Sequence, residues 1–253
     1  MLPPALCVCP ALARVSLQRA AEGCAPLPPL RVAVYMHQKE HGRASNTGCL
    51  LAPALGATIY LAGLKEHEAE LAAMLNLSQS SSSSSSSSFA PDGHDVAEWE
   101  GGVCAVLWPG EESVSLEELR AATPPARWAR GLTLLALDAT WAGARKLLHR
   151  LPPGAPRLSV DAAAFEPGRS LLFPARRYSG EAAERRCTYE AVVAALDALG
   201  ALRAGERAAL QLNLKLKVDA VLLHKNRRPA YGKDTAEALA AARELALRQI
   251  AGE

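Results

Sequence analysis

The sequence lacks several features that would assign it to a common class of protein. Among its 253 residues, no apolar run approaches the roughly 20 residues that a membrane-spanning helix needs. It has no glycine-rich dinucleotide fingerprint, no Walker motif and no G-x-S-x-G nucleophile turn. Its net charge is only +2, which excludes a strongly basic nucleic-acid protein of the histone kind. Any claim of RNA binding must therefore depend on where the arginines lie.

Cysteines are few and scattered. In a chain without a recognisable secretory signal, they favour reduced thiols in an intracellular protein, either cytoplasmic or nuclear. The first thirty residues are rich in Ala, Leu, Pro and Arg, with Glu22 as their only acid, a composition also compatible with import into an organelle. The six cysteines are Cys7, Cys9, Cys24, Cys49, Cys104 and Cys187.

Composition and low-complexity runs predict how the chain is organised. Hydrophobic residues make up 49% of it, which is typical of a soluble globular protein. We expect an irregular, Pro-rich segment over residues 1–29, a main domain over 30–230 and a helical tail over 231–253. Residues 76–98 contain an uninterrupted serine run from Ser80 to Ser88, which buries nothing and predicts a disordered insertion.

Strands and helices alternate along the main domain. This alternation predicts an α/β fold, with a mostly parallel central sheet flanked by helices in a single domain. In such a sheet, ligands bind at the carboxyl ends of the strands. The helix expected at 206–227 contains a local alternation, 210–218, that also fits a strand. Strands are expected at 30–36, 58–61, 103–107, 132–137 and 158–160, and further helices at 49–55, 115–122, 141–151 and 188–199.

Polar segments follow three of the strands, and a fourth opens a helix. Residues 37–48, 107–110 and 138–141 would meet at one edge of a parallel sheet, and residues 185–191 begin the helix at 188–199. Two histidines and a glutamate in the first segment suggest a metal, but His-x-x-Glu-His on a loop lacks the helical spacing that gathers ligands. We therefore expect no metal at His37, Glu40 and His41.

Each polar segment has a structural interpretation beside the functional one. Asn46-Thr47-Gly48 is either a helix cap with a flexible turn or an anion site made of free backbone N–H groups. Asp138 is either the N-cap of the helix that follows it or a proton acceptor for a bound substrate. Trp141 is expected in the core, and Arg145 and Lys146 are either solvated or in contact with phosphates. The residues alone predict an α/β domain with an arginine-lined, anion-binding cleft.

Four segments together resemble one family. His37-Gln38-Lys39-Glu40 and Arg43-Ala44-Ser45-Asn46-Thr47-Gly48 resemble the H-x-K-E…R-x-x-N-T-G signature of DTW-domain proteins. Leu107-Trp108-Pro109 resembles the L-Y-P element of that family, and Asp138-Ala139-Thr140-Trp141 with Ala144-Arg145-Lys146 resembles its D-x-T-W-x-x-A-R-K element. Cys187-Thr188-Tyr189-Glu190-Ala191 resembles its S-T-x-E-A. The segments occur in family order over roughly residues 30–230.

The resemblance implies a tRNA-uridine aminocarboxypropyltransferase. Such enzymes move the 3-amino-3-carboxypropyl group of S-adenosyl-L-methionine to N3 of a uridine in tRNA, and they are related to the SPOUT-like RNA enzymes, which carry a knot. It assigns Asp138 as the general base and Arg43, Arg145, Lys146 and Arg177 as tRNA contacts. The candidates for the S-adenosylmethionine site are Asn46, Thr47, Gly48, Leu107, Pro109, Thr140, Trp141, Thr188 and Glu190.

The sequence also departs from the family. Members commonly begin with a C-x-x-C…C-x-C cluster that is interpreted as a zinc site, whereas here only Cys7 and Cys9 remain. Two cysteines do not complete a tetrahedral site, so no metal is expected. Two alternatives stay open: an RNA methyltransferase that uses the same cofactor, and a non-catalytic RNA-binding module. We expect tRNA as the partner, with neither a membrane nor an obligate protein partner.

Overall fold

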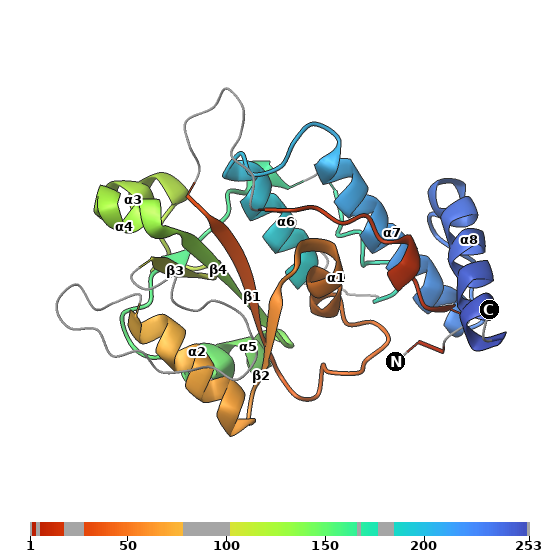
Figure 1. Cartoon of the computed structure of the whole chain (residues 1–253), viewed down its shortest axis with the longest axis horizontal. Coiled ribbons are helices and arrows are strands. Elements are labelled where there is room, and N and C mark those ends of the chain that lie inside the picture. The colour runs from red at the N-terminus through yellow and green to blue at the C-terminus, as the bar shows by residue number, and fades with distance from the viewer. Residues whose placement is uncertain are drawn as a thin grey trace. The chain divides into compact units, whose positions relative to one another are not determined.

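The computed structural model describes residues 2–3, 6–17, 28–77, 102–165, 168–176 and 185–251 (Figure 1). The chain divides into two compact units. The first, which we call the helical unit, comprises Met1–Ser16, Lys39–Ala57 and Ala162–Glu253. The second, the sheet unit, comprises Leu17–Gln38 and Thr58–Asp161. Each unit is therefore assembled from segments that are distant in the sequence.

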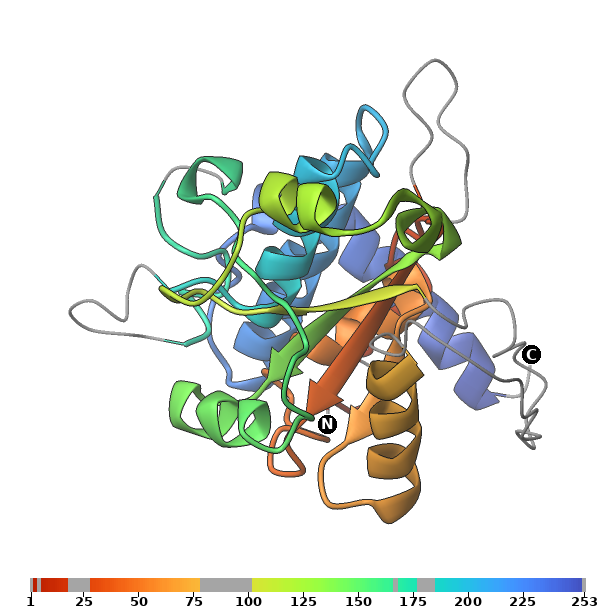
Figure 2. The ribbon, with the colours of Figure 1, turned by 90° about the vertical axis from the view of Figure 1, so that its left-hand side faces the viewer.

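The sheet unit is built on five parallel strands in the order β2-β1-β4-β3-β5. Figure 2 shows β1 and β4 side by side with their arrowheads at the same end, and Met36 of β1 stands opposite Asp138 of β4. Both strands end at this edge, so the segments that follow them start close together. The strands are β1 (Leu30–Met36), β2 (Thr58–Leu61), β3 (Val103–Leu107), β4 (Leu132–Asp138) and β5 (Arg157–Leu158).

Two helices cover one face of this sheet. Ala33 and Tyr35 of β1 pack in one cluster with Leu71 and Leu75 of α2 (Lys65–Leu77) and with Leu147 of α5 (Trp141–Leu148). The strands are apolar along almost their whole length because both faces of a parallel sheet are buried. Two shorter helices, α3 (Leu116–Ala122) and α4 (Pro125–Arg130), lie between β3 and β4 in the chain.

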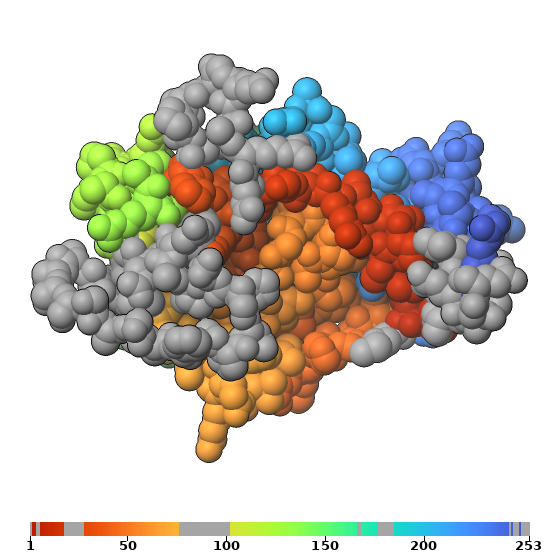
Figure 3. Space-filling model, in the orientation of Figure 1, coloured from red at the N-terminus to blue at the C-terminus, as the bar shows by residue number. Residues whose placement is uncertain are grey.

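The helical unit contains α1 (Leu51–Leu55), α6 (Thr188–Ala198), α7 (Glu206–His224) and α8 (Gly232–Ala251). Three short 3₁₀ turns belong to it as well: Cys9–Ala11, Gly48–Leu50 and Ala162–Ala164. Asn213 of α7 ties in the N-terminal segment, because its carboxamide accepts from Ala13 N and donates to Ala13 O, both at 2.8 Å. Figure 3 shows residues 6–17, in red, bordering the orange atoms of α1, where Val15 N donates to Ala54 O at 2.8 Å.

The α/β class and the parallel sheet are confirmed, and so are several local predictions. Ser115 and Glu118 form the expected capping box of α3, because Glu118 N donates to Ser115 Oγ and Ser115 N to Glu118 Oε2. Gly56 ends α1 with a φ of 69°, a left-handed conformation that suits glycine. Residues 206–224 are helical, so the strand alternative at 210–218 is wrong. The knot and the division at residues 29 and 230 stay predictions.

Other boundaries need correction. The helix expected to reach residue 151 ends at Leu148, and the strand expected at 158–160 is the pair Arg157–Leu158. Helix α2 continues to Leu77, so the insertion expected at 76–98 does not begin at residue 76. The rest of that insertion, with its serine run, lies outside the described residues.

Candidate functional site

The residues singled out in the sequence fall into two groups, one in each unit. The sheet unit holds Leu107, Pro109, Asp138, Thr140, Trp141, Arg145 and Lys146. The helical unit holds Arg43, Asn46, Thr47, Gly48, Thr188 and Glu190. Arg177 lies outside the described residues.

Asp138 is the last residue of β4, and it is buried, with 6% of its surface exposed. Its backbone carbonyl accepts from His37 N at 2.9 Å, which fixes the start of the segment that follows β1. The N-cap of α5 is Thr140, whose hydroxyl oxygen accepts from Gly143 N at 3.2 Å. The interpretation of Asp138 as the helix cap is therefore wrong. Its carboxylate sits at the carboxyl end of the sheet, where ligands of α/β proteins bind.

Two tryptophan rings meet after the carboxyl ends of β3 and β4. The rings of Trp108, after β3, and Trp141, at the first position of α5, have centroids 5.7 Å apart and planes inclined at 60°. Trp141 is half-buried, so the prediction that it lies in the core is wrong: Ala144 and Leu147 are the residues of α5 that are buried. Leu107 is buried as the last residue of β3, and Pro109 is exposed.

The start of α5 also lies close to His37. A Cβ added to Gly143 would stand 3.0 Å from the Ala139 Cβ, 3.2 Å from the Thr140 Oγ1 and 4.0 Å from the His37 Cδ2. Because Gly143 has no Cβ, the first turn of α5 can lie this close to Ala139, Thr140 and His37. Arg145 and Lys146 of α5 are exposed, so a polyanion can reach them.

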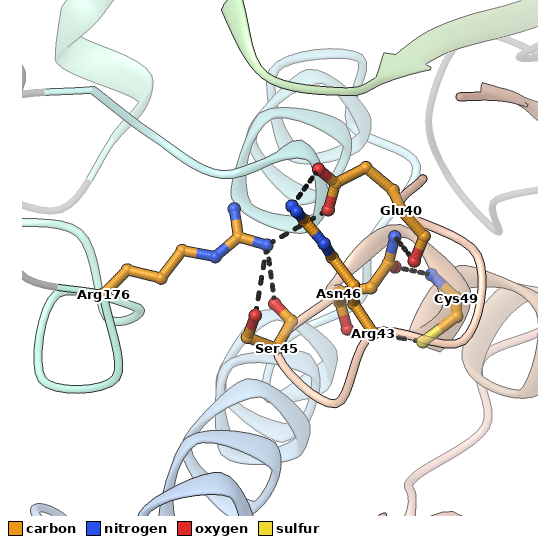
Figure 4. Close-up of polar contacts among 6 residues, drawn as sticks. All are labelled: Glu40, Arg43, Ser45, Asn46, Cys49 and Arg176. Atoms are coloured by element: carbon orange, nitrogen blue, oxygen red, sulfur yellow. Dashed lines mark hydrogen bonds and ion pairs between the residues drawn. The ribbon is translucent and has the colours of Figure 1, made fainter. Parts of the chain in front are cut away.

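In the helical unit, a buried glutamate organises the loop that contains Arg43 (Figure 4). Glu40 is 4% exposed, and its carboxylate binds Arg43 Nη1 at 2.6 Å and Arg176 Nη2 at 3.5 Å. Arg176 Nη2 also donates to the backbone oxygen of Ser45 at 3.0 Å. Half of the Arg43 side chain, 51%, remains exposed. One buried anion therefore holds two guanidinium groups in place, and Arg43 stays accessible to solvent.

The Asn46 side chain makes two hydrogen bonds within its own loop. Its Oδ1 accepts from Cys49 N at 2.8 Å, inside the turn Gly48–Leu50, and its Nδ2 donates to Glu40 O at 3.2 Å. The N-cap position of this turn is Thr47, without a side-chain cap bond, so Asn46 supports the turn from the residue before the cap. Thr47 and Gly48 are buried beside it.

The start of α6 is tied to the same loop. The Thr47 hydroxyl hydrogen-bonds the Cys187 side chain directly before the helix. Desolvation by burial raises the pKa of the Cys187 thiol well above its usual value, and the nearby charge of Glu190 raises it further. This thiol is therefore protonated at neutral pH and is not a nucleophile.

Glu190 is engaged in holding the chain. Its carboxylate accepts from Cys187 N at 3.0 Å, from Leu171 N at 2.9 Å and from the Ser170 hydroxyl. Thr188, the first residue of α6, is half-buried. The glutamate of the S-T-x-E-A-like segment thus fixes both the helix start and the loop at 170–171.

Sequence reasoning missed the roles of Glu40, Arg176 and Trp108. Glu40 was considered as a metal ligand and as the last residue of the H-x-K-E-like segment, and its ion pair with Arg176 was not predicted. The ion pair joins residues 136 positions apart, so no local pattern reports it. The only available signal for Trp108 was its place in the Leu107-Trp108-Pro109 element.

Neither a metal centre nor a membrane span is found in the part of the chain that the structure describes. No group of three or more His, Cys, Asp or Glu side chains is arranged there to hold a metal ion. None of its helices is long and apolar enough to cross a membrane. Cys7 and Cys9 are free thiols in the helical unit.

Comparison with known proteins gives one family. No curated protein and no solved structure matches the chain. The model of the DTW domain matches residues 1–222, which include all four of the segments that carry the resemblance. That match covers most of the chain, and it shows that the protein belongs to the DTW-domain family, which is associated with tRNA modification.

Proposed function

We propose that this protein is a tRNA-uridine aminocarboxypropyltransferase, which moves the 3-amino-3-carboxypropyl group of S-adenosyl-L-methionine to N3 of a uridine. The proposal depends mainly on the position and the burial of Asp138. Asp138 is buried at the carboxyl end of β4, and it is not the N-cap of α5, which is Thr140. A family associated with tRNA modification supplies the substrate class.

Asp138 would act as the general base. N3 of uridine carries a proton and is a weak nucleophile until that proton leaves. A carboxylate within hydrogen-bond reach accepts the proton as the new N–C bond forms, and such a base contributes about 10²–10⁴-fold to the rate. Asp138 is fixed for this task because its backbone belongs to β4 and accepts from His37 N.

Each unit by itself offers groups with the chemistry that parts of S-adenosylmethionine need. When bound, this cofactor supplies an electrophilic carbon attached to a sulfonium, which leaves as a neutral thioether. The rings of Trp108 and Trp141 offer faces that attract a cation such as sulfonium. The first-turn N–H groups of α5 and α6 lack intrahelical acceptors and suit the amino-acid carboxylate. Asn46, Thr47, Gly48, Leu107, Pro109, Thr140, Trp141, Thr188 and Glu190 would hold the cofactor, with Asn46 and Glu190 acting mainly by shaping the backbone.

The RNA would be held by exposed basic side chains. Arg43 is half exposed and oriented by Glu40, and Arg145 and Lys146 project from α5. Guanidinium and ammonium groups of this kind bind phosphates with little dependence on sequence. Arg177 stays a candidate for the same role.

Labelled cofactor tests the proposal. Purified protein is incubated with unmodified tRNA and S-adenosylmethionine labelled in the aminocarboxypropyl carbons, and the nucleosides are identified by mass. We expect the label on uridine. A methylated nucleoside without label would place the protein among methyltransferases instead. An unmodified tRNA that still binds would indicate a non-catalytic module and would contradict the proposal.

A further inference from the structure

A basic turn connects α7 to α8 within the helical unit (Figure 1). We define it as residues 225–230, and it carries the cations Lys225, Arg227 and Arg228. No acid occurs from residue 220 to residue 233, although the whole chain balances 28 Lys and Arg against 26 Asp and Glu. Positive charge is therefore concentrated in this turn rather than spread evenly along the chain.

All three cations of the basic turn are exposed to solvent. None of their side chains forms an ion pair or a hydrogen bond with another residue in the part of the chain that the structure describes. The two acids that border this stretch of sequence have other partners. Asp219 is fully buried and accepts from Ala230 N at 2.6 Å. Asp234 pairs with Lys215 at 2.5 Å, so the three positive charges are available to an anionic partner.

Hydrogen bonds fix the backbone of the basic turn at both ends. Arg227 N donates to Leu222 O at 2.8 Å, which ties the start of the turn to the last turn of α7. Asn226 has a φ of 54°, the left-handed conformation that commonly ends a helix. The bond from Ala230 N to the buried Asp219 holds the other end. The cations are thus presented from an ordered backbone, which lowers the entropy that is lost when they bind a partner.

The surroundings of the basic turn favour a nucleic acid over a lipid surface. Segments that bind membranes combine cations with several large apolar side chains. In the described part of the chain, Leu223 is the only large apolar residue exposed beside the turn, at 37%. The match to the DTW domain ends at residue 222, so the turn lies outside the region that the family shares. The association of that family with tRNA modification supplies a polyanion as the partner.

We propose that the basic turn binds the phosphate backbone of the tRNA through Lys225, Arg227 and Arg228. The identity of the RNA rests on the proposed function. Exposed Lys and Arg side chains neutralise phosphates and release counterions, so the affinity they supply falls with salt and depends little on base sequence. The turn therefore strengthens the binding of tRNA without selecting the uridine that reacts.

A pair of charge-matched variants tests this contact. Arg227→Gln with Arg228→Gln removes two charges from the basic turn. Arg14→Gln with Arg203→Gln removes two exposed charges from elsewhere in the same unit, and Arg203 lies beside the opposite end of α7. Binding of fluorescent, unmodified tRNA is measured without S-adenosylmethionine at several salt concentrations. We expect about tenfold weaker binding and a salt slope lower by about 1.4–1.8 for the turn variant, and less than about twofold weaker binding for the control.

A third variant separates charge from side-chain shape. Arg227→Lys with Arg228→Lys keeps both charges, so its affinity should stay within about twofold of the wild type at an unchanged salt slope. An equal loss in the Lys and Gln variants would overturn a contact based on charge. In the transfer reaction, the Gln variant should raise the KM for tRNA and leave kcat unchanged, because the turn supplies affinity rather than chemistry. Circular dichroism of each variant confirms that it is folded before its affinity is compared.

The outcomes distinguish this proposal from the proposed function. Equal affinities of the turn variant and the control variant would overturn the RNA contact, even where the wild type transfers the aminocarboxypropyl group. Phosphatidylserine vesicles that displace tRNA from the wild type as well as unlabelled tRNA does would overturn it too, because the turn would then be a site for anionic lipid. Turn-dependent tRNA binding by a protein without any transfer would support the contact and overturn only the proposed chemistry.

Discussion

At the scale of single residues, Glu40 binds several parts of the loop between β1 and α1. It is a buried carboxylate held by two guanidinium groups, and its backbone oxygen accepts from Asn46. Removing one partner of a buried ion pair is costly because the other charges remain desolvated. Glu40 therefore orients Arg43 and Arg176 and also stabilises the loop that contains them.

Replacing this charge tests that view. Glu40→Gln keeps the size of the side chain but leaves Arg43 and Arg176 without their anion, so we expect a loss of about 1–3 kcal/mol in the free energy of unfolding. Urea denaturation measures it. Glu117→Gln on exposed α3 serves as the matched control and should change stability by less than about 0.5 kcal/mol. Equal effects of the two substitutions would show that Glu40 has no organising role.

Residue roles were only half predictable from the sequence. The capping and functional interpretations were both open for Asn46 and for Asp138, and the structure assigns the N-cap positions to Thr47 and Thr140 instead. Backbone geometry decides these assignments. Thr140 has a φ of −62° and a ψ of 157°, the extended conformation of an N-cap, two residues after Asp138. Sequence alone does not fix which of several polar residues adopts that conformation.

At the scale of elements, the junction between α7 and α8 depends on one buried acid. Asp219 is fully buried, and it accepts from Ala230 N at 2.6 Å, from Tyr231 N at 3.0 Å and from the Thr235 hydroxyl at 2.5 Å. These bonds attach the start of α8 to the middle of α7. Tyr231 in turn donates to Leu171 O at 2.8 Å, which links the junction to the loop beside α6.

Loss of this acid should loosen α8. Asp219→Ala leaves the backbone N–H groups of Ala230 and Tyr231 without their acceptor and the Thr235 hydroxyl with only Tyr231 O, so we expect a cost of about 2–4 kcal/mol and faster amide exchange in α8. Hydrogen exchange followed by mass spectrometry measures the second effect directly. Asp234→Asn alters the exposed partner of Lys215 and should cost less than about 1 kcal/mol. Unchanged exchange in α8 of the Asp219 variant would contradict the junction role.

Elements with a strong hydrophobic pattern were predictable. The central strands are short apolar runs, and the apolar face of α7, from Leu210 to Leu222, follows the helical repeat. Helices α2 and α4 were missed. Helix α2 directly precedes the serine-rich segment, and α4 is only six residues long, begins at Pro125 and buries no residue. Whether such segments become helices depends on their packing against neighbouring segments, which a local pattern does not contain.

At the scale of the molecule, the buried thiol of Cys104 contributes to the response to alkaline pH. Burial raises the pKa of Cys104 in β3 to about 12, whereas an unfolded cysteine titrates near 8.5. The unfolded chain therefore loses this proton first as pH rises, and the stability present below about pH 8.5 is lost above it. Cys187 shifts in the same direction in the helical unit.

Unfolding in urea at several pH values checks the sign. From pH 8.5 to pH 10.5, Cys104 alone should lower the free energy of unfolding by about 2–3 kcal/mol. Cys104→Ala should be less stable at pH 7.5, because it leaves a gap in the sheet, but should lose less stability over that interval. A variant whose stability falls as steeply as that of the wild type would show that this thiol does not determine the pH response.

The assembly of each unit was beyond the reach of the sequence. The helical unit joins residues as distant as Ala13 and Asn213, and the H-x-K-E-like segment is divided between units at Gln38 and Lys39. Such contacts depend on the packing of whole elements rather than on local spacing. The sequence alone shows the order of the four family segments, but it does not show which side chains stabilise them.

The most direct test of the account is the transfer reaction of the Asp138→Asn variant beside the wild type. Both are incubated with unmodified tRNA and S-adenosylmethionine labelled in the aminocarboxypropyl carbons, and tRNA affinity is measured in parallel, with Asp161→Asn on the exposed end of the sheet unit as the control. We expect labelled uridine from the wild type and the control. The Asp138→Asn variant should give at least 10²-fold less, at a nearly unchanged affinity for tRNA. Transfer at the wild-type rate by Asp138→Asn would contradict the account.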